Sequence, residues 1–132
     1  MASSTLEQAI EAYLRQQSSI TALVQNKVYW LMADERATYP YIIYKTVTGT
    51  STDTRIGQTS GRQALVQFDI YGKDKIKLLN IGNALITVFN QFSGSMDGLN
   101  VFISTTGIVR PVHEPEAGIF HFILEVDFDY KE

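Results

Sequence analysis

The chain has 132 residues, of which 45% are hydrophobic and 19% are charged, a balance typical of one ordinary globular domain. It carries 11 Lys and Arg against 14 Asp and Glu, so its net charge of −3 argues against a protein that wraps nucleic acid. The absence of cysteine excludes disulfides, thiolate metal sites and a cysteine nucleophile. We therefore expect a single domain over residues 1–132.

The N-terminus has neither a basic flank nor an apolar run, so it does not resemble a secretory signal. The apolar stretches are also far shorter than the ~20 residues that span a bilayer. We expect a protein that is made and used in the cytosol, or exported by other means, and that has no membrane partner.

Residues 4–17 are predicted to form an amphipathic helix. Ser4 and Glu7 have the Ser-x-x-Glu spacing of a capping box, in which each side chain accepts a hydrogen bond from a backbone N–H at the helix start. Apolar residues follow at helical spacing: Leu6, Ile10, Tyr13 and Leu14. A short helical turn over residues 18–25 and a short strand over residues 28–31 are expected next.

The middle of the chain is predicted to form two strands that flank a polar segment. Residues 41–48, directly after Pro40, are rich in β-branched and aromatic residues, and residues 63–71 alternate between apolar and polar side chains. Residues 49–61 have little to bury, so we expect an exposed loop or a protruding hairpin arm. The residues of this region that we expect to contact another subunit are Thr50, Thr52, Arg55, Ile56, Gln58 and Arg62.

The C-terminal half is predicted to contain a long helix over residues 74–92, a strand over residues 99–105, a turn over residues 113–118 and a last strand over residues 119–130. The last strand has the clearest alternation in the chain. Its apolar residues are expected to face the core: Phe120, Phe122, Leu124, Val126, Phe128 and Tyr130.

These elements predict an α+β fold in the order α-β-β-β-α-β-β. We expect an antiparallel sheet with the two amphipathic helices packed on one face and the polar arm protruding from it. A doubly wound nucleotide-binding fold is not expected, because the sequence lacks an alternating βαβ pattern.

A row of carboxylates is the first candidate site. The candidate acidic face consists of Asp69, Glu125, Asp127 and Asp129. The last three occupy alternate positions of one strand, ~7 Å apart, and such a row could hold a divalent cation or supply acid–base groups. Because side chains at alternate positions point in parallel rather than converge, we interpret the row as solvated or paired with cations such as Lys45 or Lys73.

Other chemical signatures are weak. His113 and His121 are the only histidines, and they lack the spacing of a metal-binding pair. The polar arm contains neither Gly-Lys-Ser/Thr nor Gly-x-Gly-x-x-Gly, so it is not a phosphate-binding loop. We interpret the central aromatic residues as core and subunit contacts rather than as a platform for bases: Tyr29, Trp30, Tyr39, Tyr41 and Tyr44. We expect no enzyme, no cofactor and no bound metal.

The order and spacing of several motifs resemble the tail-completion family of long-tailed bacteriophages, whose members are tail terminators or head–tail joining proteins. The motifs are, in chain order, Ile20-Thr21-Ala22-Leu23-Val24, Lys27-Val28-Tyr29-Trp30, Tyr39-Pro40-Tyr41-Ile42-Ile43-Tyr44 and Val66-Gln67-Phe68-Asp69-Ile70-Tyr71. The early helix, the polar arm and the Phe-rich last strand complete the likeness, which covers residues 6–130.

This resemblance implies a structural virion protein without catalysis. Such proteins form a ring, typically a hexamer, that stops polymerisation of the tail tube and meets the head connector. The implied location is the tail or head–tail junction of a virion assembled in the host cytoplasm, and the implied partners are the tail tube protein and head connector proteins. An acidic channel would let DNA pass without specific binding, because like charges repel the phosphates. The alternative is a small soluble binding or enzyme-like domain that uses the acidic face of the C-terminal strand.

Overall fold

The computed structural model describes residues 5–53 and 60–131, with the backbone alone for residues 50–53, 60 and 113–116. The helices and strands in this part of the chain are α1 (Leu6–Arg15), α2 (Ser18–Val24), β1 (Val28–Trp30), β2 (Tyr41–Asp53), β3 (Ser60–Gly72), α3 (Lys75–Phe89), β4 (Gly94–Met96), β5 (Leu99–Thr106), β6 (Arg110–Glu116) and β7 (Ile119–Lys131). The α+β class is confirmed. The predicted order lacks α2, which was expected only as a turn, and the strands β4 and β6.

The strands form one sheet in the order β1-β2-β3-β7-β5-β4, and β6 also pairs with β7. All pairs are antiparallel except β1 and β2, which run parallel. The expectation of an antiparallel sheet is therefore wrong at this edge. The chain between β1 and β2 returns to the end of the sheet from which β1 started, so that the two strands run in the same direction.

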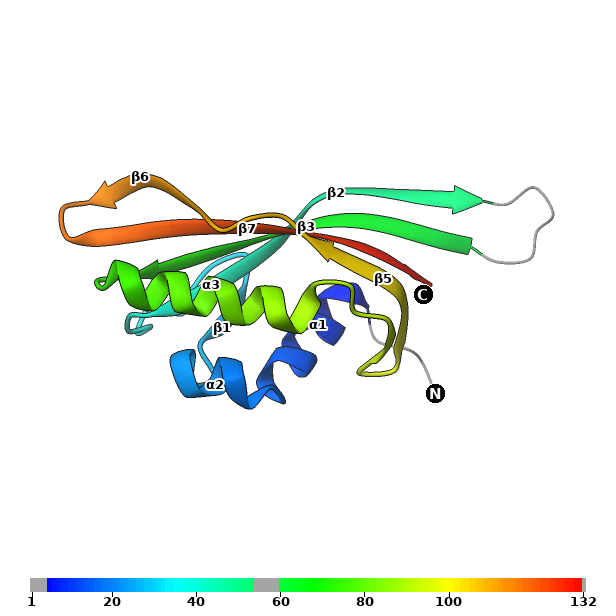
Figure 1. Ribbon diagram of the computed structural model, residues 1–132, viewed down its shortest axis with the longest axis horizontal. Coiled ribbons are helices and arrows are strands. Elements are labelled where there is room, and N and C mark those ends of the chain that lie inside the picture. The colour runs from blue at the N-terminus through cyan, green and yellow to red at the C-terminus, as the bar shows by residue number, and fades with distance from the viewer. Residues whose placement is uncertain (1–4, 54–59, 132) are drawn as a thin grey trace.

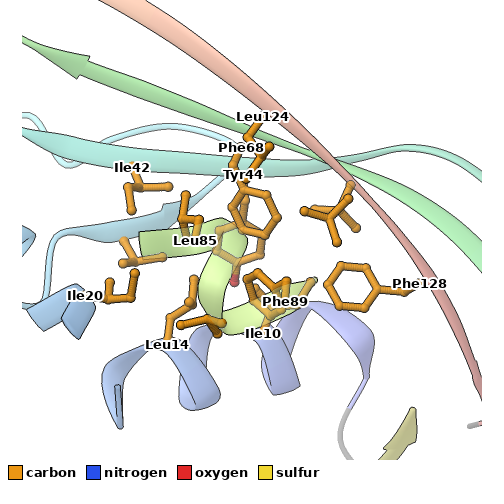
Figure 2. Close-up of a cluster of buried hydrophobic side chains, with 14 of the residues drawn as sticks. Ile10, Leu14, Ile20, Ile42, Tyr44, Phe68, Leu85, Phe89, Leu124 and Phe128 are labelled. Atoms are coloured by element: carbon orange, nitrogen blue, oxygen red, sulfur yellow. The ribbon is translucent and has the colours of Figure 1, made fainter. Parts of the chain in front are cut away.

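All three helices lie on the same side of the sheet, and the core fills the space between them and the strands (Figures 1 and 2). Phe68 of β3 stacks on Phe89 of α3 with ring centroids 5.4 Å apart, and Phe89 meets Phe128 of β7 edge-on at 5.3 Å. The alternation predicted for the two central strands is confirmed for Ala64 to Ile70 and for Leu124 to Tyr130, where every second side chain is buried. Phe120 and Phe122 are only partly buried at the end of this row.

The first helix begins with a capping box, but the two residues differ from those predicted. Thr5 Oγ1 accepts a hydrogen bond from the backbone N–H of Gln8, and Gln8 Oε1 accepts one from the backbone N–H of Thr5 at 3.1 Å. The Ser4–Glu7 box is therefore wrong by one residue. Glu7 turns toward β2 instead, where its Oε2 accepts a hydrogen bond from Thr46 Oγ1 at 2.7 Å.

The predicted polar arm is a hairpin rather than a loop over its described residues. β2 continues to Asp53 and β3 resumes at Ser60, and the register pairs these two residues. The hairpin extends past the helices on one side of the molecule (Figure 1). Residues 54–59 lie outside the described residues.

A second hairpin, β6–β7, extends at the opposite side of the molecule (Figure 1). Residues 113–118 were predicted as a turn, but β6 runs to Glu116, and the turn is confined to Ala117 and Gly118, which has a φ of +82°. A proline in a strand is tolerated at a sheet edge, which explains how β6 accommodates Pro111 and Pro115.

Candidate assembly surface

The side of the sheet that faces away from the helices carries the four predicted carboxylates, and we call it the outer face. It is built by the residues that alternate with the core residues of β3 and β7. The register pairs Gln67 with Glu125, Asp69 with Ile123, and Tyr71 with His121. The acidic residues from the two strands therefore share one surface.

Asp69 is the buried member of this face, with 5% of its surface exposed. Its Oδ1 lies 2.9 Å from His121 Nε2 and accepts a second hydrogen bond from Gln67 Nε2, also at 2.9 Å. Three side chains from two adjacent strands thus form a closed polar network in the sheet. The carboxylate of Asp69 is therefore engaged in structure, and it does not extend the exposed acidic row of β7.

A row of stacked rings crosses the sheet next to this network. The ring centroids are 5.3 Å apart between Tyr39 and Tyr41, 5.4 Å between Tyr41 and Tyr71, and 4.2 Å between Tyr71 and His121. Burial, and after it the neighbouring Tyr39, raises the pKa of Tyr41; burial, and after it Asp69, raises the pKa of Tyr71. Both hydroxyls therefore stay protonated in neutral solution and can donate hydrogen bonds.

The central aromatic residues were interpreted as core and subunit contacts, and Tyr44 alone among them lies in the core. Tyr44 is 2% exposed, and its hydroxyl donates to the backbone carbonyl of Glu7 at 2.9 Å. Tyr29 meets the edge of Tyr41 with centroids 6.0 Å apart, so it joins the row on the outer face, and Trp30 is 52% exposed. The register explains why Tyr41 lies outside the core, because only every second residue of β2 points toward the helices. Trp30 pairs with Tyr44 on the side of α1, and it stays exposed because β1 is an edge strand.

The three carboxylates of β7 have different surroundings. Glu125 Oε1 lies 3.4 Å from Arg110 Nη2 of β6, in an exposed ion pair. Its partner is thus neither Lys45 nor Lys73. Lys45 belongs to β2, which β3 separates from β7, and Lys73 follows the end of β3, six positions beyond the residue that pairs with Glu125. Asp127 and Asp129 line a hollow of about 300 Å³ together with Gln63, Ile103, Thr105 and Phe128.

Three of the six predicted subunit-contact residues lie in the described part of the hairpin. Thr50 and Thr52 belong to β2, where they pair with Gln63 and Gly61. Arg62 is exposed on β3, between Ser51 and Tyr130 in the register. The remaining three residues, Arg55, Ile56 and Gln58, lie outside the described residues.

An apolar patch lies at the end of β1, where Trp30 was predicted as a core or subunit contact but Leu31 and Met32 were not predicted as a surface. Trp30, Leu31 and Met32 are 52%, 58% and 75% exposed. Trp30 and Tyr44 form the aromatic walls of a groove of about 280 Å³, whose other lining residues are Thr5, Glu7, Gln8 and Glu11 of the α1 region. The sequence signal that could have revealed this patch is the unbroken run of three apolar residues, because a half-buried strand would alternate apolar and polar side chains.

These surfaces offer hydrogen bonds, rings and apolar contacts, but little that converges on one point. Within the described residues, no group of three or more His, Cys, Asp or Glu could hold a metal ion. None of the helices described is both long enough and apolar enough to cross a bilayer.

Comparison with solved structures identifies a protein of similar fold. No family model and no curated protein matches the sequence. Among solved structures, one chain from the "Virion of native gene transfer agent (GTA) particle" superposes with a TM-score of 0.72, over 98% of this chain and 100% of that chain, at 11% sequence identity. At this level of identity the likeness shows that the two chains share a fold.

Proposed function

We propose that this protein is a structural component of a virion, where it caps the tail tube and joins it to the head connector as an oligomeric ring without catalysis. The observation that carries the proposal is the match in fold over 98% of the chain to a chain of a gene transfer agent virion. The order of the sequence motifs, which resembles that of the tail-completion family, supports the same role. The proposed stoichiometry is that of the family, a hexamer.

The exposed hairpin supports assembly into a ring. A closed ring needs a heterologous interface, in which two different surfaces of each subunit meet. Gly49, Arg62 and Gln63 of the β2–β3 hairpin are exposed, and no helix covers this end of the sheet (Figure 1). We propose that the hairpin reaches a neighbouring subunit through Thr50, Thr52, Arg55, Ile56, Gln58 and Arg62.

The acidic face supports a role beside DNA. No ion pair of Asp127 or Asp129 is found among the described residues, so these carboxylates present uncompensated negative charge. A channel with such a lining repels phosphates and lets DNA pass without specific binding. The proposed protein partners on the two sides of the ring are the tail tube protein and the head connector.

Electron microscopy of tails made with and without this protein tests the proposal. Without it, we expect tubes of uncontrolled length that fail to join heads. A variant in which residues 50–63 are replaced by Asn-Gly joins the paired residues Gly49 and Ala64 by a two-residue turn. We expect this variant to fold but not to cap tails, and normal capping by it would contradict the role of the hairpin.

A binding or enzyme-like role for the acidic face is the second candidate, because Asp127 and Asp129 line the hollow on the outer face. This candidate requires a ligand that fits between parallel carboxylates. Titration with divalent cations, described below, separates it from the proposed structural role.

A further inference from the structure

Two of the exposed apolar sites in the described residues lie toward opposite edges of the sheet. One is the Trp30 patch, formed by Trp30, Leu31 and Met32 at the end of β1, which is the first edge strand. The other is Ile108, which is 78% exposed in the connection between β5 and β6. β3 pairs with one edge of β7, and both β5 and β6 pair with its other edge. Ile108 connects β5 to β6, so it lies away from β1.

The backbone holds both surfaces in place. Leu31 has a φ of +73°, a strained conformation for a bulky residue, and its N–H donates to the carbonyl of Tyr44 at 3.0 Å. On the other side, the N–H of Gly107 donates to the carbonyl of Glu125 at 2.9 Å. Val109 packs so closely on α3 that a Cβ at Gly82 would lie 2.5 Å from its Cγ2. Gly107 and Val109 are therefore both held in place, and the exposed Ile108 lies between them.

The groove beside Trp30 complements the Ile108 side in apolar character and charge. The exposed ring of Trp30 and the buried Tyr44 line it, together with Glu7 and Glu11. Glu7 Oε2 accepts the hydrogen bond from Thr46, and Glu11 Oε1 lies 3.8 Å from Arg15 Nη2 in an exposed ion pair, so the two carboxylates leave a net negative charge beside the groove. Ile108 offers one branched apolar side chain, and two residues later Arg110 offers a guanidinium whose ion pair with Glu125 is exposed. An apolar side chain with an adjacent cation is the chemistry that such a groove would accept.

We infer that Ile108 and Arg110 of one copy dock into the Trp30 groove of the next copy. The occupant is a second copy because one such contact covers both exposed surfaces, which cannot meet within one subunit. Since the two surfaces differ, the contact is heterologous and repeats head to tail until the ring closes. The inference rests on the ring of the proposed function and assigns its main apolar contact.

Engineered cysteines test the contact, and the natural chain has none to interfere. Met32→Cys and Ile108→Cys are made in separate preparations, one of them isotopically labelled, and mixed under mild oxidation. We expect heterodimers joined through positions 32 and 108 to form at least about ten times faster than 32–32 or 108–108 dimers. Asn80→Cys, on the exposed side of α3, replaces Ile108→Cys in the control mixture. Equal rates in the two mixtures, or dominant 32–32 dimers, would overturn the inference.

Truncation variants distinguish this inference from the proposed function. Trp30→Ala should slow 32–108 crosslinking at least about tenfold, whereas Leu79→Ala, a partly exposed apolar residue of α3, should leave the rate unchanged. Rings seen by light scattering without 32–108 crosslinks would refute the contact and leave the proposed function standing. Efficient 32–108 crosslinks in a protein whose removal leaves tail length unchanged would support the contact and refute the capping role.

Discussion

The two faces of the central strands β3 and β7 are made from alternate residues of the same segments, yet different forces hold them. On the inner face, Phe68 and Phe128 are almost fully buried against Phe89 of α3. On the outer face, Asp69 and His121 are joined by a hydrogen bond beside a row of stacked rings. The comparison indicates that the inner face supplies most of the stability, because the free energy of burial grows with the apolar area removed from water, whereas each hydrogen bond contributes little net free energy. The outer face is left to interact with other molecules.

Deletion of residues 119–132 is expected to have the largest effect, because it removes both faces of β7 at once. β7 pairs with β3, β5 and β6, and it carries four buried apolar residues of the core: Leu124, Val126, Phe128 and Tyr130. We expect the shortened chain to lose cooperative unfolding in circular dichroism melts. A melt like that of the full chain would contradict the central position of β7.

Phe68→Ala should cost about 3–5 kcal/mol of the free energy of unfolding, since it leaves a cavity in the inner face. Phe68 contacts Tyr44 and Phe89 with ring centroids 6.0 and 5.4 Å apart. Phe122→Ala is the matched control on the neighbouring strand. Because Phe122 is only partly buried, it should cost distinctly less. Urea unfolding measures both, and equal losses would mean that the core extends to the end of β7.

Asp69→Ala should cost about 1–3 kcal/mol, because it leaves His121 and Gln67 without their shared acceptor on the outer face. A double-mutant cycle with His121→Phe isolates the hydrogen bond, since phenylalanine keeps a ring to stack on Tyr71. We expect a coupling free energy of about 1 kcal/mol between positions 69 and 121. Additive losses within the error of urea unfolding would show that the pair contributes nothing by itself.

The sequence is informative about the inner face and much less so about the outer one. The strand alternation alone decides which of the residues around Phe68 and Leu124 meet the helices, and that part of the fold could be predicted. The contact between Asp69 and His121 joins residues 52 positions apart. It depends on a register that local patterns do not fix. The strand β6 was missed for a related reason, because Pro115 is compatible with a strand only at a sheet edge.

Tyr44→Phe should cost about 0.5–1.5 kcal/mol in neutral solution, by removing the hydrogen bond to the carbonyl of Glu7 on the inner side. Burial, and after it the nearby Glu11 and Glu7, raises the pKa of Tyr44 above its ordinary value of 10.0. Below that pH the hydroxyl is protonated in both the folded and unfolded chains and adds no pH dependence. Above it the unfolded chain ionises first, so stability falls as pH rises toward the folded-state pKa.

The variant should therefore lose less stability than the natural protein between about pH 8 and about pH 11. Urea midpoints at the two pH values measure the difference. Tyr29→Phe, at a tyrosine of the outer face, controls for the removal of one hydroxyl from the chain. Parallel pH profiles for Tyr44→Phe and the natural protein would contradict the burial of this hydroxyl.

Asp127→Asn combined with Asp129→Asn is expected to have the smallest effect on folding. Both carboxylates belong to the outer face, and among the described residues neither has an ion-pair partner to lose. We expect the urea midpoint to change little and calorimetric titration with calcium, magnesium or manganese to show no binding in the micromolar range. The physical reason is that alternate side chains of one strand point in parallel, whereas a cation requires several oxygens that converge on it. A tight, stoichiometric heat in the natural protein that disappears in the variant would instead make the hollow beside Asp127 a binding site, and it would favour the second candidate function over a purely structural one.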